Sequence, residues 1–492
     1  MTQKLDVFII GAGISGIGIA CHLSRQCPDK SFGLFEARAS FGGTWDLFKY
    51  PGIRSDSDMY TFGYSFRPWD KGKDIAPAED ILDYLNSTIT DYGLADHIHY
   101  HHKVTGAKWS STDKHWTITV ENTQNGLETV YQAGFLVSGM GYYDYDNPHN
   151  PTITGEENFQ GQIIHPQLWD PATDYTDKRV VIIGSGATAV TLVPAMAEKA
   201  AHVTMLQRSP TYMVSRPAAS KSNRLLMKLL GKNLGHRFIR WKFRTLQELA
   251  IWFAGRYPDT FAKMLKKDAD KRLGGKVATD PHFSPRYKPW EQRLCLIPDG
   301  DLYTALRDGK ASIVTDQIDH ITKNGIQLKS GNHLDADLIL KATGLKLNVQ
   351  KGLNLSVDET PIQISDHIFY KSVMLDNIPN FIPVVGYASQ SWTLKVDLVG
   401  NYLCRLLQKM DQENVKMATP KLDRAHIDPD QLYPCLGRIQ SAGYIQRGKD
   451  AIPKQLPLDG QFNPAFHVHD QYSKDRQTLE DSPLDDGILT FQ

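Results

Sequence analysis

Apolar and polar positions follow one another along the chain in an order that predicts two copies of one supersecondary unit. The apolar run LDVFII, residues 5–10, leads into a glycine turn, a segment with helical spacing, and a second apolar run that ends at Glu36. Residues 180–208, VVIIGSGATAVTLVPAMAEKAAHVTMLQR, repeat this order, with Gly184 lying 173 positions after Gly11. Strand, turn, helix and strand in this order form a βαβ unit. The pattern therefore predicts an α/β fold with two Rossmann-like dinucleotide-binding domains.

The remaining segments differ in character from these two units. Residues 220–275 carry apolar residues three and four positions apart with basic residues between them, which predicts a helical insertion. A strand at 337–344 and a long helix that begins at SWTLKVDL follow. After about residue 411 the pattern weakens into a polar tail, to which the sequence assigns no role.

Composition favours a multidomain protein that acts on small molecules. The 492 residues exceed what one hydrophobic core usually organises. The 55 Lys and Arg balance 55 Asp and Glu, so no basic excess indicates a nucleic acid or an anionic membrane as partner. The five cysteines are scattered without a CxxC pair, which argues against disulfides and zinc and favours the cytoplasm. No leader is expected before Leu5, and no apolar run reaches the roughly 18 residues of a membrane span.

The first glycine turn has the spacing GxGxxG, formed by Gly11, Gly13 and Gly16. Glycine there permits a tight turn, close approach of a pyrophosphate and close helix packing, while the helix N-terminus offers free N–H groups to phosphates. Glu36 follows 20 residues after Gly16, where a carboxylate can accept hydrogen bonds from ribose hydroxyls. These residues predict a dinucleotide site, with a turn used only for packing as the alternative.

The second glycine turn is the GxGxxA variant, formed by Gly184, Gly186 and Ala189. The apolar run that follows it ends in Arg208 and Ser209 and has no acidic residue. A carboxylate would repel a 2′-phosphate, whereas a guanidinium can pair with one. This site therefore suits NADPH rather than NADH, with a solvated Arg208 as the plainer alternative.

In the first site the second strand ends in Glu36, and in the second site it ends in Arg208. This difference predicts FAD in the first site and NADPH in the second, with hydride transfer from NADPH to the flavin. Disulfide reductases share this arrangement but need a cysteine pair beside the flavin, and ARASFGGTWDLFKYPG, residues 37–52, contains none. We therefore expect oxygen to accept the electrons. The expected divisions are an FAD-binding domain at 1–147 and 336–435, a linker at 148–175, an NADP-binding domain at 176–335 with its helical insertion at about 217–280, and a C-terminal tail at 436–492.

The segment between the two units, FQGQIIHPQLWD, places two aromatics and a histidine where a linker is usually small and polar. Phe159, Gly161, His165, Trp169 and Asp170 match FxGxxxHxxxW followed by Pro or Asp. A second motif consists of GGxW, then an aromatic residue followed by Pro-Gly, then Asp. It is matched by Gly42, Gly43, Trp45, Tyr50, Pro51, Gly52 and Asp56. On these motifs the chain resembles the flavin-dependent Baeyer–Villiger monooxygenases, which are class B flavoprotein monooxygenases. It is most similar to the branch that contains the mycobacterial monooxygenase activating the prodrug ethionamide, over about residues 1–410.

The resemblance implies an enzyme that uses NADPH and O2 to convert ketones to esters through a C4a-peroxyflavin, and that also oxidises sulfides or thioamides. It implies that Arg293 stabilises the developing negative charge and that Asp56 orients this arginine. A surface-paired Arg293 and a turn-capping Asp56 are the plainer alternatives. It also implies FAD contacts for Ser15, Gly43, Thr44, Trp45, Asp46, Leu47 and Val104, positions between the two cofactors for Arg54 and Ser55, and NADP contacts for Ser185, Ala187 and Thr188.

The same resemblance gives the linker a control role, in which His165 and Trp169 couple movement of the two cofactor domains. The plainer alternative is that Phe159 and Trp169 fill a domain interface. The helix start at Ser391 to Thr393 is expected either to face the flavin ring or to be a simple capped helix.

The helical insertion has two interpretations. Its mixture of Trp, Phe, Leu and Lys suits either a cap over the substrate entrance or a helix that lies on a membrane surface. The zero net charge favours the cap and leaves peripheral membrane association open. The histidines of HIHYHH are expected on a solvated strand face, with no metal, because a single row of imidazoles is a poor metal site.

Three functions remain in competition at this point. A Baeyer–Villiger monooxygenase with a small ketone or sulfur substrate is favoured by Arg293 and Asp170. The alternatives are a monooxygenase that oxidises only nitrogen or sulfur, and a catalytically silent sensor that binds both nucleotides.

Overall fold

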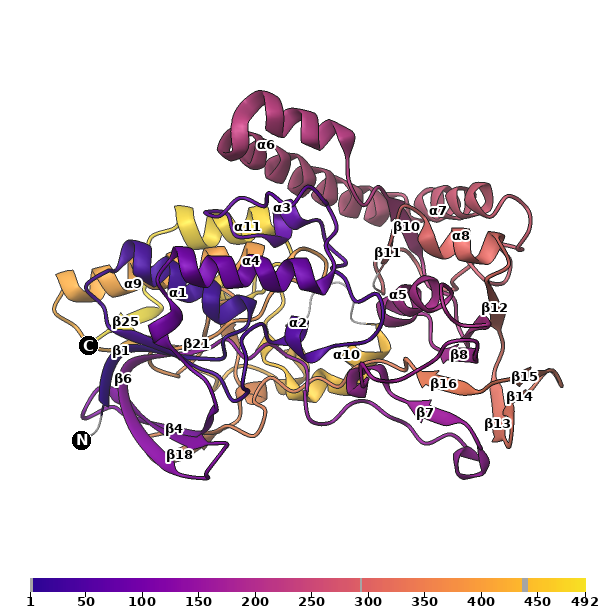
Figure 1. Cartoon of the computed structure of the whole chain (residues 1–492). Helices are drawn as coiled ribbons and strands as arrows, with labels where there is room; N and C mark the ends of the chain where they lie inside the picture. Colours follow the sequence, from indigo (N-terminus) through magenta and orange to yellow (C-terminus); the bar gives the residue numbers. More distant parts are fainter. Residues whose placement is uncertain (1–2, 293, 436–440) are drawn as a thin grey trace.

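The largest sheet of the described residues, with nine strands, organises the first Rossmann-like unit (Figure 1). The computed structural model describes residues 3–292, 294–435 and 441–492. In the described residues the strand order is β18-β17-β4-β5-β6-β1-β2-β3, and β21 also pairs with β6. The bounds are β1 Gln3–Ile10, β2 Phe32–Phe35, β3 Ile98–His99, β4 His102–Ser110, β5 His115–Asn122, β6 Glu128–Ser138, β17 Asn354–Val357, β18 Thr360–Ile362 and β21 Phe381–Pro383.

The centre of this sheet is parallel and buried on both faces. β1 pairs in parallel with β2 and with β6. Its residues Val7 to Ile10 are at most 4% exposed, because helices cover one face and the antiparallel strands β4 and β5 curl over the other. A continuous apolar run, rather than an alternating one, is what such a position requires. The covering helices are α1 Ile14–Gln26, α4 Ala78–Asp91 and α9 Trp392–Gln412.

The second sheet is parallel throughout, in the order β12-β9-β8-β16-β7. Its strands are β7 Gln162–Ile164, β8 Arg179–Ile183, β9 His202–Gln207, β12 Ala311–Thr315 and β16 Leu338–Lys341, with α5 Ala187–Met196 and α8 Asp301–Arg307 on one face. The linker therefore supplies an edge strand, although its sequence does not have a strand pattern. The expected boundary at residue 335 would separate β16 from its sheet, so we propose that the boundary follows Lys341 instead.

Shorter elements connect and flank these two units. The helices are α2 Thr44–Leu47, α3 Met59–Phe62, α7 Pro258–Leu273, α10 Gly443–Gly448 and α11 Tyr472–Arg476. The strands are β10 Met213–Arg216, β11 Cys295–Pro298, β13 Ile318–Thr322, β14 Gly325–Leu328, β15 His333–Asp335, β19 Phe369–Tyr370, β20 Met374–Leu375, β22 Ala418–Pro420, β23 Tyr433–Pro434, β24 Lys454–Gln455 and β25 Leu489–Phe491.

The segment expected as a helical insertion contains α6, Lys221–Arg256, and α7. α6 is bent into two arms at Gly231, where φ is +74°. In Figure 1 it stands above the rest of the chain. Arg240 anchors it, because the guanidinium donates to the carbonyl oxygens of Tyr60, Thr61 and Gly63 and to Asp397 Oδ2 at 2.8 Å. Among the helices of the described chain, none is both long and apolar enough to cross a membrane.

The C-terminal tail is part of the first unit, in contrast to the weak pattern of its sequence. β25 pairs antiparallel with β22. The α11 residue Asp475 accepts from Lys395 Nζ of α9 at 2.5 Å, and both side chains are buried. Because two buried charges require each other, this ion pair fixes the tail against the helix.

The buried His236 of α6 makes the stability of the folded protein depend on pH. Burial, followed by the charge of Arg240, lowers the pKa of His236 to about 4. An unfolded histidine titrates near 6.5, so the folded state is fully favoured above that pH and loses stability as the pH falls towards 4. Between pH 7 and 5 the loss amounts to about 2 kcal/mol.

We expect His236→Leu to remove that part of the acid sensitivity, because neither ring nitrogen has a hydrogen-bond partner among the described residues. Urea unfolding at pH 7 and pH 5 measures the difference, with the exposed His333→Leu as control. Equal pH dependence of wild type and His236→Leu would contradict the assignment.

Candidate active site

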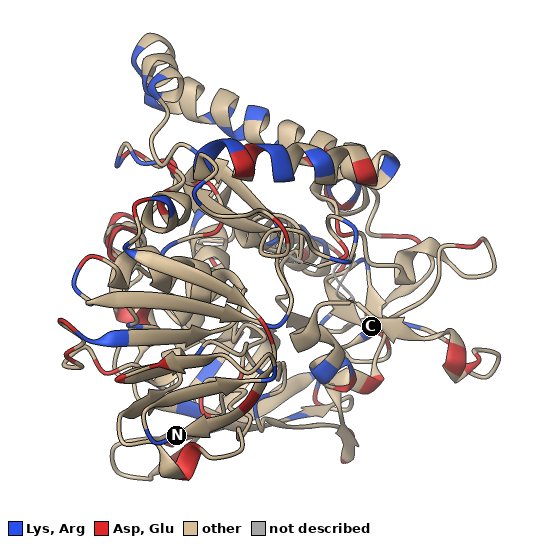
Figure 2. Cartoon of the chain, turned by 90° about the vertical axis from the view of Figure 1, so that its right-hand side faces the viewer, with Lys and Arg blue, Asp and Glu red and all other residues tan. Residues whose placement is uncertain are grey.

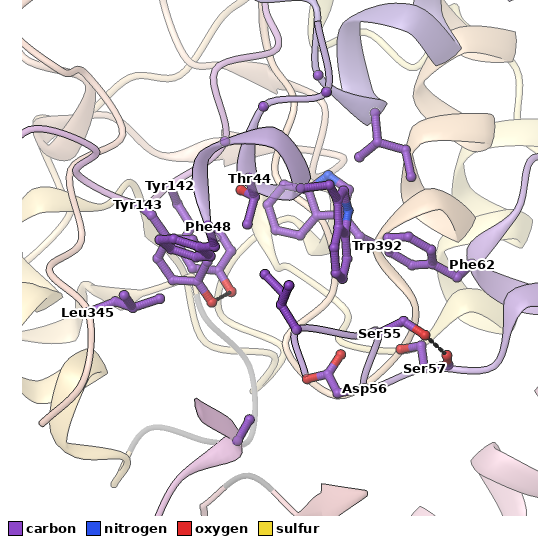
Figure 3. Close-up of a pocket in the computed structure, with 18 of the residues that line it drawn as sticks. Thr44, Phe48, Ser55, Asp56, Ser57, Phe62, Tyr142, Tyr143, Leu345 and Trp392 are labelled. Atoms are coloured by element: carbon purple, nitrogen blue, oxygen red, sulfur yellow. Dashed lines mark hydrogen bonds between the residues drawn. The ribbon is translucent and has the colours of Figure 1, made fainter. Parts of the chain in front are cut away.

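Both glycine turns open into one cavity of about 220 Å³ that lies between the two sheets (Figure 3). The first turn contributes Gly13 and Ser15, and the second contributes Ala187 and Thr188. Between them lie Gly43, Thr44, Trp45, Arg54, Ser55 and Asp56, all expected from the sequence. The structure therefore brings together residues from segments that are far apart in the chain.

The first turn is shaped by contacts that admit only glycine at its end. A Cβ on Gly16 would lie 1.9 Å from the carbonyl oxygen of Gly11, so α1 packs directly against the turn. Gly13 caps α1 without any side-chain hydrogen bond to the first turn of the helix. The N–H groups at this helix start are thus available to an anion, as a pyrophosphate site requires.

Glu36 lies at the end of β2 with both carboxylate oxygens oriented by the backbone. Oε2 accepts from the N–H of Ala12 at 2.9 Å, and Oε1 accepts from the N–H of Arg38 at 3.0 Å. The side chain is buried. Because a carboxylate can accept about four hydrogen bonds, this geometry leaves capacity for ribose hydroxyls.

The second turn repeats this construction and leaves open space in front of it. A Cβ on Gly184 would lie 2.3 Å from the oxygen of Ala342, whereas a Cβ on Gly186 would meet no atom within 4 Å. Gly186 caps α5, again without a side-chain hydrogen bond. Ser185 Oγ donates to the carbonyl oxygen of Ser209 at 2.8 Å, so the turn lies against the strand end that carries the exposed Arg208.

The GGTW segment folds into α2 at the edge of the cavity. Thr44 Oγ1 and Tyr145 Oη are 3.0 Å apart, and the Trp45 ring stands edge-on to Phe62 at 5.5 Å. Asp46 lies behind this wall, where it pairs with Arg38 at 2.7 Å and with Lys49 at 3.1 Å. These ion pairs hold the turn. Neither Asp46 nor Leu47 is among the cavity-lining residues, and their FAD contacts stay predictions.

Arg54, Ser55 and Asp56 follow along the cavity wall. Arg54 forms an ion pair with Asp301 at the start of α8, so it links the two units. Ser55 Oγ donates to the carbonyl oxygen of Ser57 at 2.7 Å, and the nearby Asp56 carboxylate lies at the cavity (Figure 3). Arg293, which we expect to be oriented by Asp56, lies outside the described residues.

The linker touches both units, but not through the cavity. His165 Nδ1 accepts from the N–H of Gln167 at 3.1 Å, and burial lowers the pKa of His165. Gln167 Nε2 donates to the carbonyl oxygens of Asp144 and Tyr145, both at 2.9 Å, and so ties the linker to the first unit. Trp169 packs in the core of the second unit. The sequence pattern did not single out Gln167, which makes the connection.

Several cavity-lining residues were not expected from the sequence. Tyr142, Tyr143 and Tyr145 follow β6, and Tyr387 precedes α9. The apolar run into a glycine turn, FLVSGMGYY, is the signal that could have identified the first two. Trp392 at the start of α9 donates from Nε1 to Ser15 Oγ at 2.7 Å, which places this helix start at the cavity (Figure 3).

Lys351 is a further residue near the first site that was not expected from the sequence. Its Nζ lies 3.9 Å above the Tyr145 ring and donates to the carbonyl oxygen of Met140. Burial lowers the pKa of Lys351 to about 8, against the opposing charge of Glu36. A buried amine next to a dinucleotide site adds positive potential where phosphates are expected.

Two other expectations lie away from the cavity. Val104 is buried in β4 opposite Val120 and is not among the lining residues. The histidine segment is not a solvated strand face, because His97 and His99 stack on Phe32 and Phe35 at 4.3 and 4.7 Å. Within the described ranges, no group of His, Cys, Asp and Glu could hold a metal.

Comparison with known proteins places the chain in a family. The family described as flavin-binding monooxygenase-like matches residues 4–257. The probable FAD-binding monooxygenase AlmA of Acinetobacter sp is 45% identical over 494 residues, covering 100% of this chain and 97% of that protein. The FAD-containing monooxygenase EthA of Mycobacterium tuberculosis (strain ATCC 25618 / H37Rv) is 43% identical over 493 residues, covering 100% and 98%.

Solved structures show the same fold. An oxidized steroid monooxygenase bound to NADP aligns with a TM-score of 0.76 at 21% identity, covering 99% of both chains. The OTEMO complex with FAD and NADP aligns with a TM-score of 0.67 at 20% identity, covering 86% of this chain and 87% of that one. The expected α/β architecture is thereby confirmed, and the relatives confirm the broader expectation of an FAD-containing monooxygenase. The chain belongs to the flavin-binding monooxygenase-like family.

Proposed function

We propose that this protein is an FAD-containing monooxygenase that uses NADPH and O2 to insert oxygen beside a ketone carbonyl. The observation that carries the proposal is the single cavity lined by both glycine turns, because hydride transfer requires two dinucleotides to meet. No cysteine is among the lining residues of the described chain, so a dithiol does not take the electrons. A small molecule and oxygen are the partners that remain.

The first turn is the fitting site for FAD. The uncapped start of α1 would hold the pyrophosphate, Glu36 would accept from the ribose, and Thr44 and Trp45 line the cavity in which the isoalloxazine ring would lie. The second turn is the fitting site for NADPH, since the space in front of Gly186 is open and Arg208 is exposed beside it. When bound, FAD accepts a hydride from NADPH and activates oxygen.

Arg293 and Asp56 are the groups that would direct this chemistry to a ketone. A guanidinium stays protonated at any working pH, so Arg293 can stabilise the negative charge that develops as a nucleophile attacks the carbonyl. Asp56 orients it by charge. The cavity is also lined by Tyr142, Tyr143 and Trp392, whose apolar rings would lower the local dielectric constant and so strengthen electrostatic stabilisation there.

The test is to incubate the purified flavoprotein with NADPH, isotopically labelled oxygen gas and a panel of ketones, sulfides and amines. Esters that carry the label support the proposal. Labelled sulfoxides or N-oxides without any ester would assign the protein to heteroatom oxidation only. Tight binding of both nucleotides with no labelled product would identify a silent sensor.

Coenzyme preference should depend on Arg208. We expect wild type to prefer NADPH over NADH, and Arg208→Ala to lose much of that preference, because one charge-assisted contact is worth about 1.5 to 3 kcal/mol. The ratio of kcat/KM for the two coenzymes measures this preference, and Arg307→Ala, which removes a half-buried arginine of the same unit, is the control. A wild-type enzyme that uses both coenzymes equally would show that Arg208 holds no 2′-phosphate.

A further inference from the structure

α6 has apolar side chains on two opposite faces, although only one face is packed. In the arm after Gly231 the packed face carries His236, Ile239, Arg240, Ile251 and Ala254, which are buried against the first unit. The opposite face carries Leu234, Phe238, Trp241, Leu249 and Trp252, which follow one another at four, three, eight and three positions and are exposed by 62, 43, 51, 55 and 56%. A helix that is apolar all round is normally buried, so the exposed stripe calls for a partner.

The arm before Gly231 extends the stripe. Leu225, Leu229 and Leu230 are exposed by 56, 70 and 43%. We call the exposed apolar side chains of both arms the α6 stripe. Isolated exposed leucines are ordinary, whereas nine large apolar side chains exposed on one helix, the ninth being Leu246 at 50%, are not.

The charge of α6 identifies the partner. The helix contains nine Lys or Arg and a single acidic residue, Glu248, in a chain whose total formal charge is zero. Eight of the nine basic side chains remain at least partly exposed, and Arg237 and Arg244 flank the stripe on one side. Figure 2 shows this concentration of Lys and Arg on the projecting helix.

We propose that the α6 stripe docks the protein on the surface of a bilayer that contains anionic phospholipids. The Trp and Leu side chains enter the boundary between headgroups and acyl chains, and the flanking basic side chains pair with lipid phosphates. Two exposed tryptophans fit this boundary, since the indole ring has an apolar body and a polar N–H. A protein surface would have to be both acidic and deeply apolar to match the same stripe.

The experiment is sedimentation of the intact flavoprotein with vesicles of phosphatidylcholine alone and with vesicles enriched in phosphatidylglycerol. We expect binding to the anionic vesicles at about 0.1 M salt that weakens strongly at about 1 M, where the Debye length is near 3 Å. Trp241→Ser with Trp252→Ser should weaken the binding at least about a hundredfold, because each buried aromatic contributes about a decade or more. The matched control replaces Leu127 and Leu458, exposed by 66 and 54% on other elements, with Ser.

A second pair, Arg237→Gln with Arg244→Gln, tests the charge separately and keeps the apolar stripe intact. It should weaken binding to anionic vesicles. Arg237→Gln alone, which removes an exposed side chain, should leave the unfolding midpoint unchanged. Absence of binding to anionic vesicles, or equal binding of wild type and both pairs, would overturn the proposal. A dimer in solution that dissociates in the Trp pair, without vesicle binding, would instead assign the stripe to a second copy of the chain.

Discussion

Arg293→Ala is expected to abolish ester formation while leaving reduction of the flavin by NADPH intact. Binding of FAD depends on the first glycine turn and Glu36, and reduction requires only that the two nucleotides meet in the cavity. Neither step needs stabilisation of a negative charge beside the substrate. Removing such a stabiliser raises the barrier of the oxygenation step by about 3 kcal/mol or more, which is at least a hundredfold in rate.

The measurement is NADPH consumption, hydrogen peroxide and ester in the same reaction. We expect the Arg293→Ala enzyme to consume NADPH and to release its reducing equivalents as peroxide. Arg286→Ala removes an exposed guanidinium a few residues earlier and serves as the control. Ester formation by Arg293→Ala at the wild-type rate would show that another residue carries the catalytic charge.

Arg240→Met should be the most destabilising of the substitutions considered. It would leave Asp397 buried without its guanidinium and three carbonyl oxygens without their donor. Although burial alone would raise the pKa of Asp397, a hydrogen bond from His22 and the charge of Arg240 hold it below its usual range. Breaking a buried pair from one side reduces the free energy of unfolding by about 3 to 5 kcal/mol.

The midpoint of urea unfolding, followed by flavin fluorescence and by circular dichroism, measures this loss. Arg237→Met on the exposed side of the same helix is the matched control, because it removes the same group without a buried partner. If the two variants unfold at the same midpoint, Arg240 does not anchor α6 in solution.

Much of the fold was predictable because its signals are local. The two βαβ units and the helical insertion follow from the spacing of residues within about 30 positions of each other. β7 was not predictable, because its partner Leu338–Leu340 lies far along the chain and an edge strand of three residues needs no pattern of its own. The structure of the C-terminal tail was not predictable for the same reason, because it depends on distant partners such as Lys395.

Some residues of the candidate site were likewise predictable from the sequence, and others were not. Residues that shape the backbone, such as Gly16 and Gly184, are visible in the sequence because a Cβ at either position would collide with a carbonyl oxygen. The tyrosines that line the cavity could not be recognised in the sequence. A tyrosine in a loop has no characteristic spacing that tells whether it lines a cavity or packs in a core. Gln167 was missed because its two acceptors are backbone carbonyls, which any residue provides.

The division of the first sheet between two distant parts of the chain determines the order in which the protein can fold during synthesis. All strands of the second sheet have been made once Lys341 leaves the ribosome, so this unit can close early. The first sheet is complete only after β21 has been made, its core only after α9, and β22 finds its partner only after β25. The apolar strand β1 can pair early with β2 and β6, but the helix α9 that completes the cover over its face is made more than 250 residues later.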